Sequence, residues 1–217
     1  MDFELARRNM VDNQVRTNRV TDPLVVAALR AIPREVFVPA PQKGVAYLDD
    51  DIPVTPGRYL MEPMVLARLL QLAEVQPADA VLDVGCATGY STAVLARMAS
   101  SVVALEEDPA MVNWATETLL GLGVDNAVVV EGPLAEGLPG QGPYDVIVFN
   151  GAIARVPENI RAQLAEGGRL VAVVQGERGV GHATLVTRQG GAFGHRTEFD
   201  ATIRPLPGFS GEPSFVF

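Results

Sequence analysis

The sequence predicts a doubly wound, mostly parallel α/β domain with an N-terminal helical extension, and three observations lead to this fold class. From residue 79 onward, short apolar runs alternate with segments of helical character. The runs are apolar throughout, which is typical of strands buried on both faces of a parallel sheet. The chain has 217 residues, 48% of them hydrophobic and 20% charged, which is enough for one domain with a substantial core.

The first part of the chain predicts helices followed by irregular structure. Thr21 or Asp22 is a suitable N-cap for a helix that has Pro23 at its first position. Acids, prolines and a glycine in residues 48–60 predict a surface loop. The stretch EPMVLARLLQLAEV, residues 62–75, carries apolar residues at helical spacing and predicts a further helix.

The second part of the chain predicts the sheet. Five strands are expected in the segments DAVLDVG, SVVALEE, NAVVVEG, YDVIVFNG and GRLVAVVQ. A helix capped by Asp108 follows the second of them, and another helix is expected over VPENIRAQLAEGG. The remaining stretch, HATLVTRQGGAFGHRTEFDATI, predicts a closing pair of strands around Gly190 and Gly191.

Composition and charge exclude several classes of function. The formal net charge of −9 disfavours nucleic acid as a partner, and no apolar run reaches about 18 residues, so no membrane span is expected. One cysteine, Cys86, is typical of a reducing cytoplasm. Cys86, His182 and His195 are too few and too scattered to predict a metal site. We expect a cytoplasmic monomer.

The stretch VLDVGCATGY, residues 81–90, lies where a ligand is expected, because ligands of such sheets bind off the carboxyl ends of the strands. The glycines Gly85 and Gly89 lack the spacing of the dinucleotide fingerprint, and the lysine of a phosphate-binding loop is absent from the segment. Glu106 ends the next strand, where a carboxylate can accept both hydroxyls of a ribose.

Asp83 narrows the choice of ligand, because a carboxylate at this point repels a diphosphate and attracts a cationic amino acid moiety. S-adenosylmethionine has a ribose, an ammonium and a sulfonium and carries no phosphate. The residues therefore favour S-adenosylmethionine, with a dinucleotide and a purely structural turn as the alternatives.

Three long segments resemble the protein-L-isoaspartate O-methyltransferases. These are MVDNQVRTNRVTDPLVVAALRAIPREVFVP, VLDVGCATGYSTAVLARM and GPYDVIVFNGAIARVPENIRAQLAEGGRLVAVV. The resemblance implies a cytoplasmic enzyme that methylates the carboxylate of L-isoaspartyl residues in damaged proteins and releases S-adenosyl-L-homocysteine. It also implies that residues 1–60 form the helical extension and substrate loop, and residues 61–217 the cofactor-binding domain, within a single structural unit.

The resemblance also assigns residues. The residues expected to bind the cofactor are Met64, Asp83, Gly85, Cys86, Ala87, Gly89, Glu106, Glu107, Gly132, Pro133, Leu134 and Asn150. In the substrate loop, the family pattern Gln-Thr-Ile-Ser, a variable residue and Pro is here Arg58-Tyr59-Leu60-Met61-Glu62-Pro63. Near the adenine, the family's Gly-Asp-Gly is here Gly132-Pro133-Leu134.

The candidate catalytic residues are Arg58, Tyr59, Met61 and Glu62. A carboxylate nucleophile needs positioning rather than a base, and Met61 has no donor where the family has a serine hydroxyl. Arg58 or Tyr59 could supply one, whereas Glu62 is either a base for another acceptor or a solvent-facing acid at a helix start. Three functions therefore stay open: isoaspartyl repair, methylation of a different substrate, and a non-catalytic module acting through protein contacts.

Overall fold

The computed structural model describes residues 1–176 and 179–209, and its centre is one seven-stranded sheet. The order across the sheet is β5-β4-β3-β6-β7-β8-β9. The strands are β3 (Ala80–Val84), β4 (Ser101–Glu106), β5 (Ala127–Glu131), β6 (Tyr144–Ile153), β7 (Leu164–Gln175), β8 (Gly181–Gln189) and β9 (Ala192–Ala201). The first five in space are parallel, and β8 and β9 are antiparallel to their neighbours, so the predicted fold class is confirmed.

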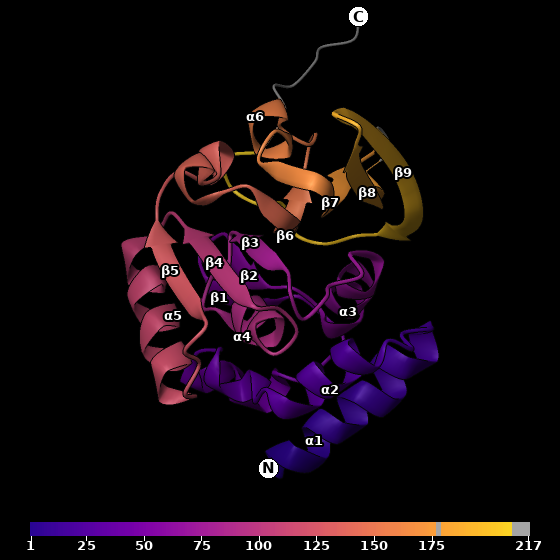
Figure 1. Ribbon diagram of the computed structural model, residues 1–217. Helices are drawn as coiled ribbons and strands as arrows, with labels where there is room; N and C mark the ends of the chain where they lie inside the picture. The colour runs from indigo at the N-terminus through magenta and orange to yellow at the C-terminus, as the bar shows by residue number, and fades with distance from the viewer. Residues whose placement is uncertain (177–178, 210–217) are drawn as a thin grey trace, which may run out of the picture.

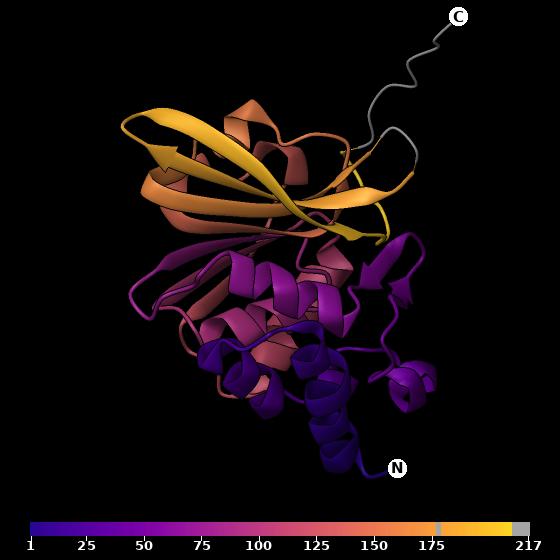
Figure 2. The same ribbon diagram turned by 90° about the vertical axis from the view of Figure 1, so that its right-hand side faces the viewer.

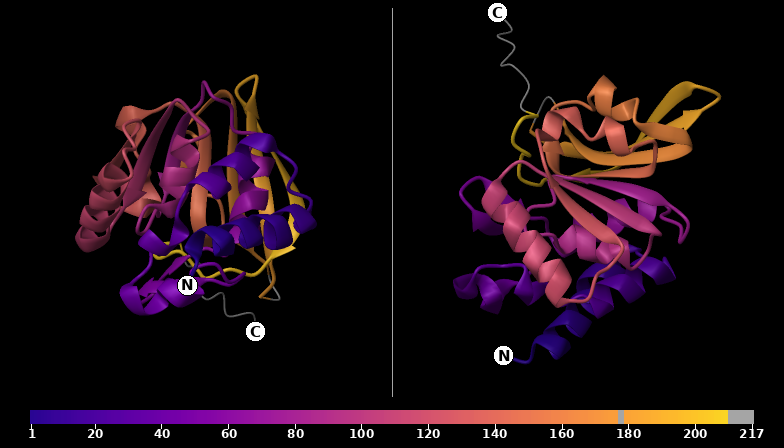
Figure 3. Two further views of the ribbon diagram at one scale, coloured as in Figure 1. Left: turned by 90° about the horizontal axis from the view of Figure 1, so that it is seen from below. Right: turned by 60° about the vertical axis from the view of Figure 1, so that its left-hand side comes forward.

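The helices gather on one face of this sheet (Figures 1 and 2). They are α1 (Phe3–Met10), α2 (Pro23–Ala31), α3 (Pro63–Leu72), α4 (Tyr90–Ala96) and α5 (Pro109–Gly121). A view from the side shows them together beneath the strands (Figure 3). Their buried side chains form one continuous core with Val102, Val146 and Val171 of the sheet, so the N-terminal extension and the sheet share a core.

The other face is covered more thinly than predicted. Its core combines Leu82, Leu105 and Phe149 of the strands with Ile160 of α6 (Glu158–Arg161) and with Leu206. The helix predicted over residues 156–168 is therefore wrong in length, since α6 has four residues and β7 begins at Leu164. The chain is drawn into the sheet there because Leu164 pairs with Tyr144.

The loop predicted over residues 48–60 is also wrong in part, because it contains a β-hairpin. Strand β1 (Ile52–Thr55) pairs antiparallel with β2 (Arg58–Leu60), and these two strands form a sheet separate from the central one. Ile52, Val54 and Leu60 are buried, whereas Pro56 and Gly57 at the turn are exposed. The hairpin thus has an apolar inner face that holds it against the domain.

Two predicted helix starts are confirmed. The carboxylate of Asp22 accepts hydrogen bonds from the backbone N–H groups of Leu24 and Val25, and that of Asp108 accepts one from Ala110. Each cap is followed by a proline at the first helical position. The cap at Asp108 fixes the start of α5 beside the end of β4.

Candidate functional site

The segment between β3 and α4 forms a tight loop at the carboxyl edge of the sheet. Gly85 and Gly89 adopt φ angles of +74° and +92°, which glycine takes without steric cost. Ala87, where the family has a glycine, lies in the same left-handed region with φ of +50°. A Cβ on Gly85 would lie 2.5 Å from Cδ1 of Leu206, so the segment after β9 packs directly on this loop.

Asp83 lies beneath the loop and is completely buried. Its Oδ2 accepts hydrogen bonds from Ser91 Oγ at 2.8 Å and Thr92 Oγ1 at 2.6 Å, and its Oδ1 accepts one from Asn150 Nδ2 at 2.5 Å. Burial raises the pKa of Asp83, and the three donors oppose that shift. In this arrangement Asp83 ties β3, α4 and β6 together, and its predicted contact with a ligand stays a prediction.

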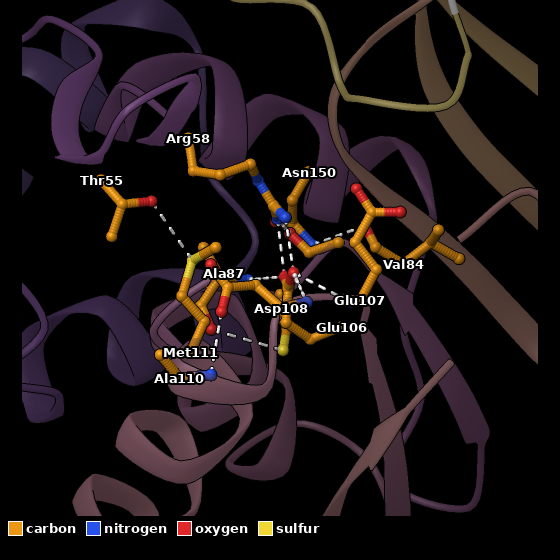
Figure 4. Close-up of polar contacts among 12 residues, drawn as sticks. Thr55, Arg58, Val84, Ala87, Glu106, Glu107, Asp108, Ala110, Met111 and Asn150 are labelled. Carbon is orange, nitrogen blue, oxygen red and sulfur yellow. Dashed lines mark hydrogen bonds and ion pairs between the residues drawn. The ribbon is translucent and has the colours of Figure 1, made fainter. Parts of the chain in front are cut away.

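Glu106 ends β4 with its carboxylate turned toward the loop (Figure 4). Oε1 accepts hydrogen bonds from the backbone N–H groups of Glu107 at 2.9 Å and Asp108 at 3.1 Å, and Oε2 accepts one from Ala87 at 2.8 Å. The position is the one predicted for a ribose acceptor. The glutamate is held by backbone donors from both the loop and the start of α5.

Arg58 occupies the space in front of this carboxylate. Its Nη1 lies 2.5 Å from Glu106 Oε1 and its Nη2 lies 2.6 Å from Oε2, a bidentate pair, and Nη2 also donates to the Gly85 carbonyl at 3.2 Å. The Arg58 side chain is 6% exposed and that of Glu106 is 0% exposed. Arg58, which was predicted to act on the substrate, therefore pairs with Glu106, which was predicted to accept the ribose hydroxyls.

The other predicted cofactor residues divide into buried and exposed ones. Cys86 is buried in the loop, and burial raises the pKa of its thiol well above the ordinary value, which disfavours a nucleophilic role. Gly132 follows β5 and donates its N–H to the Glu106 carbonyl, Leu134 is buried, and Pro133 and Glu107 are exposed.

The substrate-loop residues after Arg58 point in different directions. Met61 is buried in the main core, as expected for a side chain that fills an apolar gap, and its carbonyl accepts a hydrogen bond from Arg34. Tyr59 is half-buried and stacks beneath the guanidinium of Arg204 at 5.2 Å. The backbone N–H of Met64 donates to Asp49 at 3.3 Å, which places Met64 on the first turn of α3.

Glu62 lies among acids at the start of α3. It makes no side-chain cap hydrogen bond, whereas the Asp51 carboxylate accepts from the Glu62 backbone N–H at 2.9 Å. Burial, and then the charges of Asp49, Asp51 and Asp50, raise the pKa of Glu62 to about 7. Glu62 therefore stands at a helix start, as one of its two predicted roles requires, but it is half-buried beside three aspartates, and its role stays a prediction.

Several residues that shape the site were missed in the sequence. Arg34 is fully buried over the ring of Tyr90, and Thr88 donates from Oγ1 to the Phe37 carbonyl at 2.6 Å, so the N-terminal extension supports the loop. Leu206 closes the loop from the other side. The family pattern of the N-terminal segment was a signal for Arg34, whereas no local pattern marks Leu206.

The residues have the chemistry of a nucleoside site, but their arrangement is closed. The cavity between the loop and residues 59–61 measures about 10 Å³, room for about one water molecule. It is lined by Tyr59, Leu60, Met61, Leu66, Gly85, Cys86, Ala87, Tyr90, Ser91 and Asn150. The lining includes neither Arg58 nor Glu106, and in front of Glu106 the guanidinium of Arg58 fills the position predicted for the ribose.

In residues 1–176 and 179–209 no cluster of three or more histidine, cysteine, aspartate or glutamate side chains is placed to hold a metal ion. No helix in the same part of the chain is both long and apolar enough to cross a membrane.

A doubly wound sheet with a glycine loop after β3 and an acid at the end of β4 defines the class of nucleoside-binding α/β proteins to which many methyltransferases belong. Solved structures agree on the fold. A protein-L-isoaspartate O-methyltransferase superposes with a TM-score of 0.82 at 24% identity, covering 93% of this chain and 66% of its own. A putative enzyme of the same name from Plasmodium falciparum, in complex with S-adenosyl-L-homocysteine, gives 0.80 at 21% identity over 92% of this chain and 97% of its own.

This chain belongs to the protein-L-isoaspartate(D-aspartate) O-methyltransferase family, whose model matches residues 6–204. A protein-L-isoaspartate O-methyltransferase of Koribacter versatilis is 37% identical over 96% of this chain and 94% of its own length. One from Methanoculleus marisnigri is 38% identical over 85% and 84%. The family consists of S-adenosylmethionine-dependent methyltransferases, and the predicted family, cofactor and enzyme class are confirmed.

Proposed function

We propose that this chain transfers a methyl group from S-adenosylmethionine to the free carboxylate of L-isoaspartyl residues in proteins. The observation that carries the proposal is Glu106, whose carboxylate is held by backbone donors beside the Gly85 loop in a chain that matches this family over residues 6–204. Both relatives reported above are called protein-L-isoaspartate O-methyltransferase, and this chain matches most of the length of each.

The proposal assigns the donor to the carboxyl edge of the sheet. Glu106 would hold the ribose, and the loop from Gly85 to Gly89 would line the path of the amino acid moiety. The exposed Pro133 offers no carboxylate or N–H to the adenine, so recognition of its amino group falls to backbone carbonyls or water. The bound donor would supply a methyl group on a positively charged sulfur.

The substrate side would work by positioning. An isoaspartyl carboxylate is already an anion and needs no general base, so a donor that orients it and a dry site are what the protein must add. The buried Met61 has no such donor, which leaves the Tyr59 hydroxyl and the Arg58 guanidinium. The raised pKa of Glu62 lessens the repulsion of an anionic substrate below about pH 7.

The test compares methyl transfer to one isoaspartyl peptide with transfer to the matching aspartyl peptide. We expect slow but selective transfer by the wild type. Met61→Ser with Tyr59→Thr should raise the rate at least about tenfold, because one charged hydrogen bond of about 1.5–3 kcal/mol is regained. Glu106→Ala serves as the control that should lose transfer through weaker donor binding.

A second candidate function is methylation of a different acceptor, which the substrate loop Arg58–Pro63 favours because its side chains depart from the family pattern. Donor binding without transfer to the isoaspartyl peptide, in both the wild type and the Met61→Ser, Tyr59→Thr variant, would contradict the first proposal and support this one.

A further inference from the structure

The Glu106 carboxylate already has a full set of partners. Five hydrogen bonds reach its two oxygens, three from backbone N–H groups of Ala87, Glu107 and Asp108 and two from the guanidinium of Arg58. A carboxylate offers about four lone-pair positions. A ribose diol therefore cannot bind Glu106 unless another donor leaves.

Arg58 is the donor that can leave. The three backbone donors belong to the loop and to the start of α5, which are parts of the central fold. Arg58 instead projects from β2, in the small hairpin that pairs with no strand of the central sheet, and its other polar contact is the Gly85 carbonyl at 3.2 Å. A movement of this hairpin would remove the guanidinium without disturbing the sheet.

The limited space between the β1–β2 hairpin and the glycine loop also indicates that Arg58 must move. The hairpin and the loop leave a cavity of about 10 Å³ between them, lined by Tyr59 and Leu60 on one side and by Gly85 and Ala87 on the other. Neither Arg58 nor Glu106 lines this cavity, so the room that a ribose needs in front of Glu106 is the room that the guanidinium now fills, and it opens when Arg58 and its hairpin move away.

We propose that Arg58 is an internal competitor for the ribose position: its guanidinium pairs with Glu106 in the free protein, and the donor binds by displacing it together with the β1–β2 hairpin. Arg58 thereby sets the affinity for S-adenosylmethionine and its demethylated product. The proposal rests on the proposed function, because it assigns the ribose to Glu106. When a ligand binds only a minor conformation of a protein, its apparent affinity is the intrinsic affinity multiplied by the fraction of molecules in that conformation.

The test measures binding of S-adenosyl-L-homocysteine by titration calorimetry. Arg58→Gln removes the competing guanidinium and keeps a polar side chain, and we expect at least tenfold tighter binding than in the wild type. The matched control is Arg169→Gln, which removes the same charge and another ion pair, 2.6 Å from Asp79, without touching Glu106. Its affinity should equal that of the wild type.

A second measurement does not depend on the folding of a variant. Saturating S-adenosyl-L-homocysteine should speed amide hydrogen exchange of residues 52–60 in the wild type, because the hairpin loses its link to Glu106. Slower exchange there, or unchanged or weaker affinity in Arg58→Gln, would overturn the competition while the proposed function stands. Failure of wild type and variant alike to bind S-adenosyl-L-homocysteine would overturn both.

Discussion

The ion pair between Arg58 and Glu106 predicts an unequal loss of stability when either partner is replaced. Arg58→Gln removes two hydrogen bonds to Glu106 but leaves it three backbone donors, so we expect the free energy of unfolding to fall by about 1.5–3 kcal/mol, the range of one hydrogen bond to a charged group. Glu106→Gln removes the negative charge opposite Arg58, keeps one amide oxygen as an acceptor and turns an N–H group toward donors, so we expect a loss of about 3–5 kcal/mol.

The double variant should cost less than the sum of the two single losses, by about 2 kcal/mol, because the interaction can be lost once. Urea unfolding followed by far-UV circular dichroism and by the fluorescence of Trp114, the single tryptophan, measures all four proteins. Coincident transitions in the two signals would justify two-state analysis.

The control for this cycle is an exposed ion pair of the same chemistry. Arg196 pairs with Glu198 on β9, where the Arg196 side chain is 63% exposed, and Arg196→Gln should change stability by less than about 0.5 kcal/mol. Equal stability of Arg58→Gln and the wild type, or additive losses in the double variant, would show that the buried pair is not formed in solution.

Three further outcomes follow from the structure. The pKa of Glu62 is raised to about 7 from the ordinary 4.5, so the folded protein binds more protons than the unfolded chain between these pH values. The free energy of unfolding should therefore fall by about 1 kcal/mol, after solvent screening, as pH rises through that window, and urea titrations of Glu62→Gln should show a flatter dependence of stability on pH. Gly85→Ala should lower the free energy of unfolding by about 2–4 kcal/mol, because its φ is +74° and its new Cβ would overlap Leu206. The loss should be smaller in a Leu206→Ala background, and an equal loss in both backgrounds would rule out that contact. Fluorescence anisotropy should show an isoaspartyl peptide binding at least fivefold more tightly when S-adenosyl-L-homocysteine is present, and Arg58→Gln should abolish this coupling. Equal peptide affinities with and without the product in the wild type would contradict the coupling.

Most of the sheet could be predicted because its signals are local. The runs that became β3 and β4 are mostly apolar and have an acid at or near the end, and the cap at Asp108 fixed the start of α5. The β1–β2 hairpin was missed because Pro53, Pro56 and Gly57 interrupt the alternation of its buried residues, which on its own would indicate a strand.

The sequence names candidate site residues one by one, and their roles stay predictions, whereas their arrangement could not be predicted. Glu106 was identified from its place at a strand end, and Arg58 from its place in the substrate loop. Their pairing joins positions 48 residues apart in two different sheets, and no periodicity or spacing records a contact of that kind. The same holds for Leu206, which reaches Gly85 through the path of the chain after β9.

The position of Arg58 also orders the two binding events of the proposed reaction. A guanidinium paired with Glu106 at 2.5 and 2.6 Å is not available to a substrate carboxylate, and the buried Met61 in the same loop has no donor to replace it. Occupation of Glu106 by a ribose would release this cation at the start of β2, next to Tyr59, where the family resemblance locates the substrate. The donor would then bind first and create part of the substrate site. Because coupling between two binding sites is reciprocal, the peptide must in turn strengthen donor binding by the same factor. A single side chain would thereby keep the donor site closed in the free protein and prepare the acceptor site once the donor is bound.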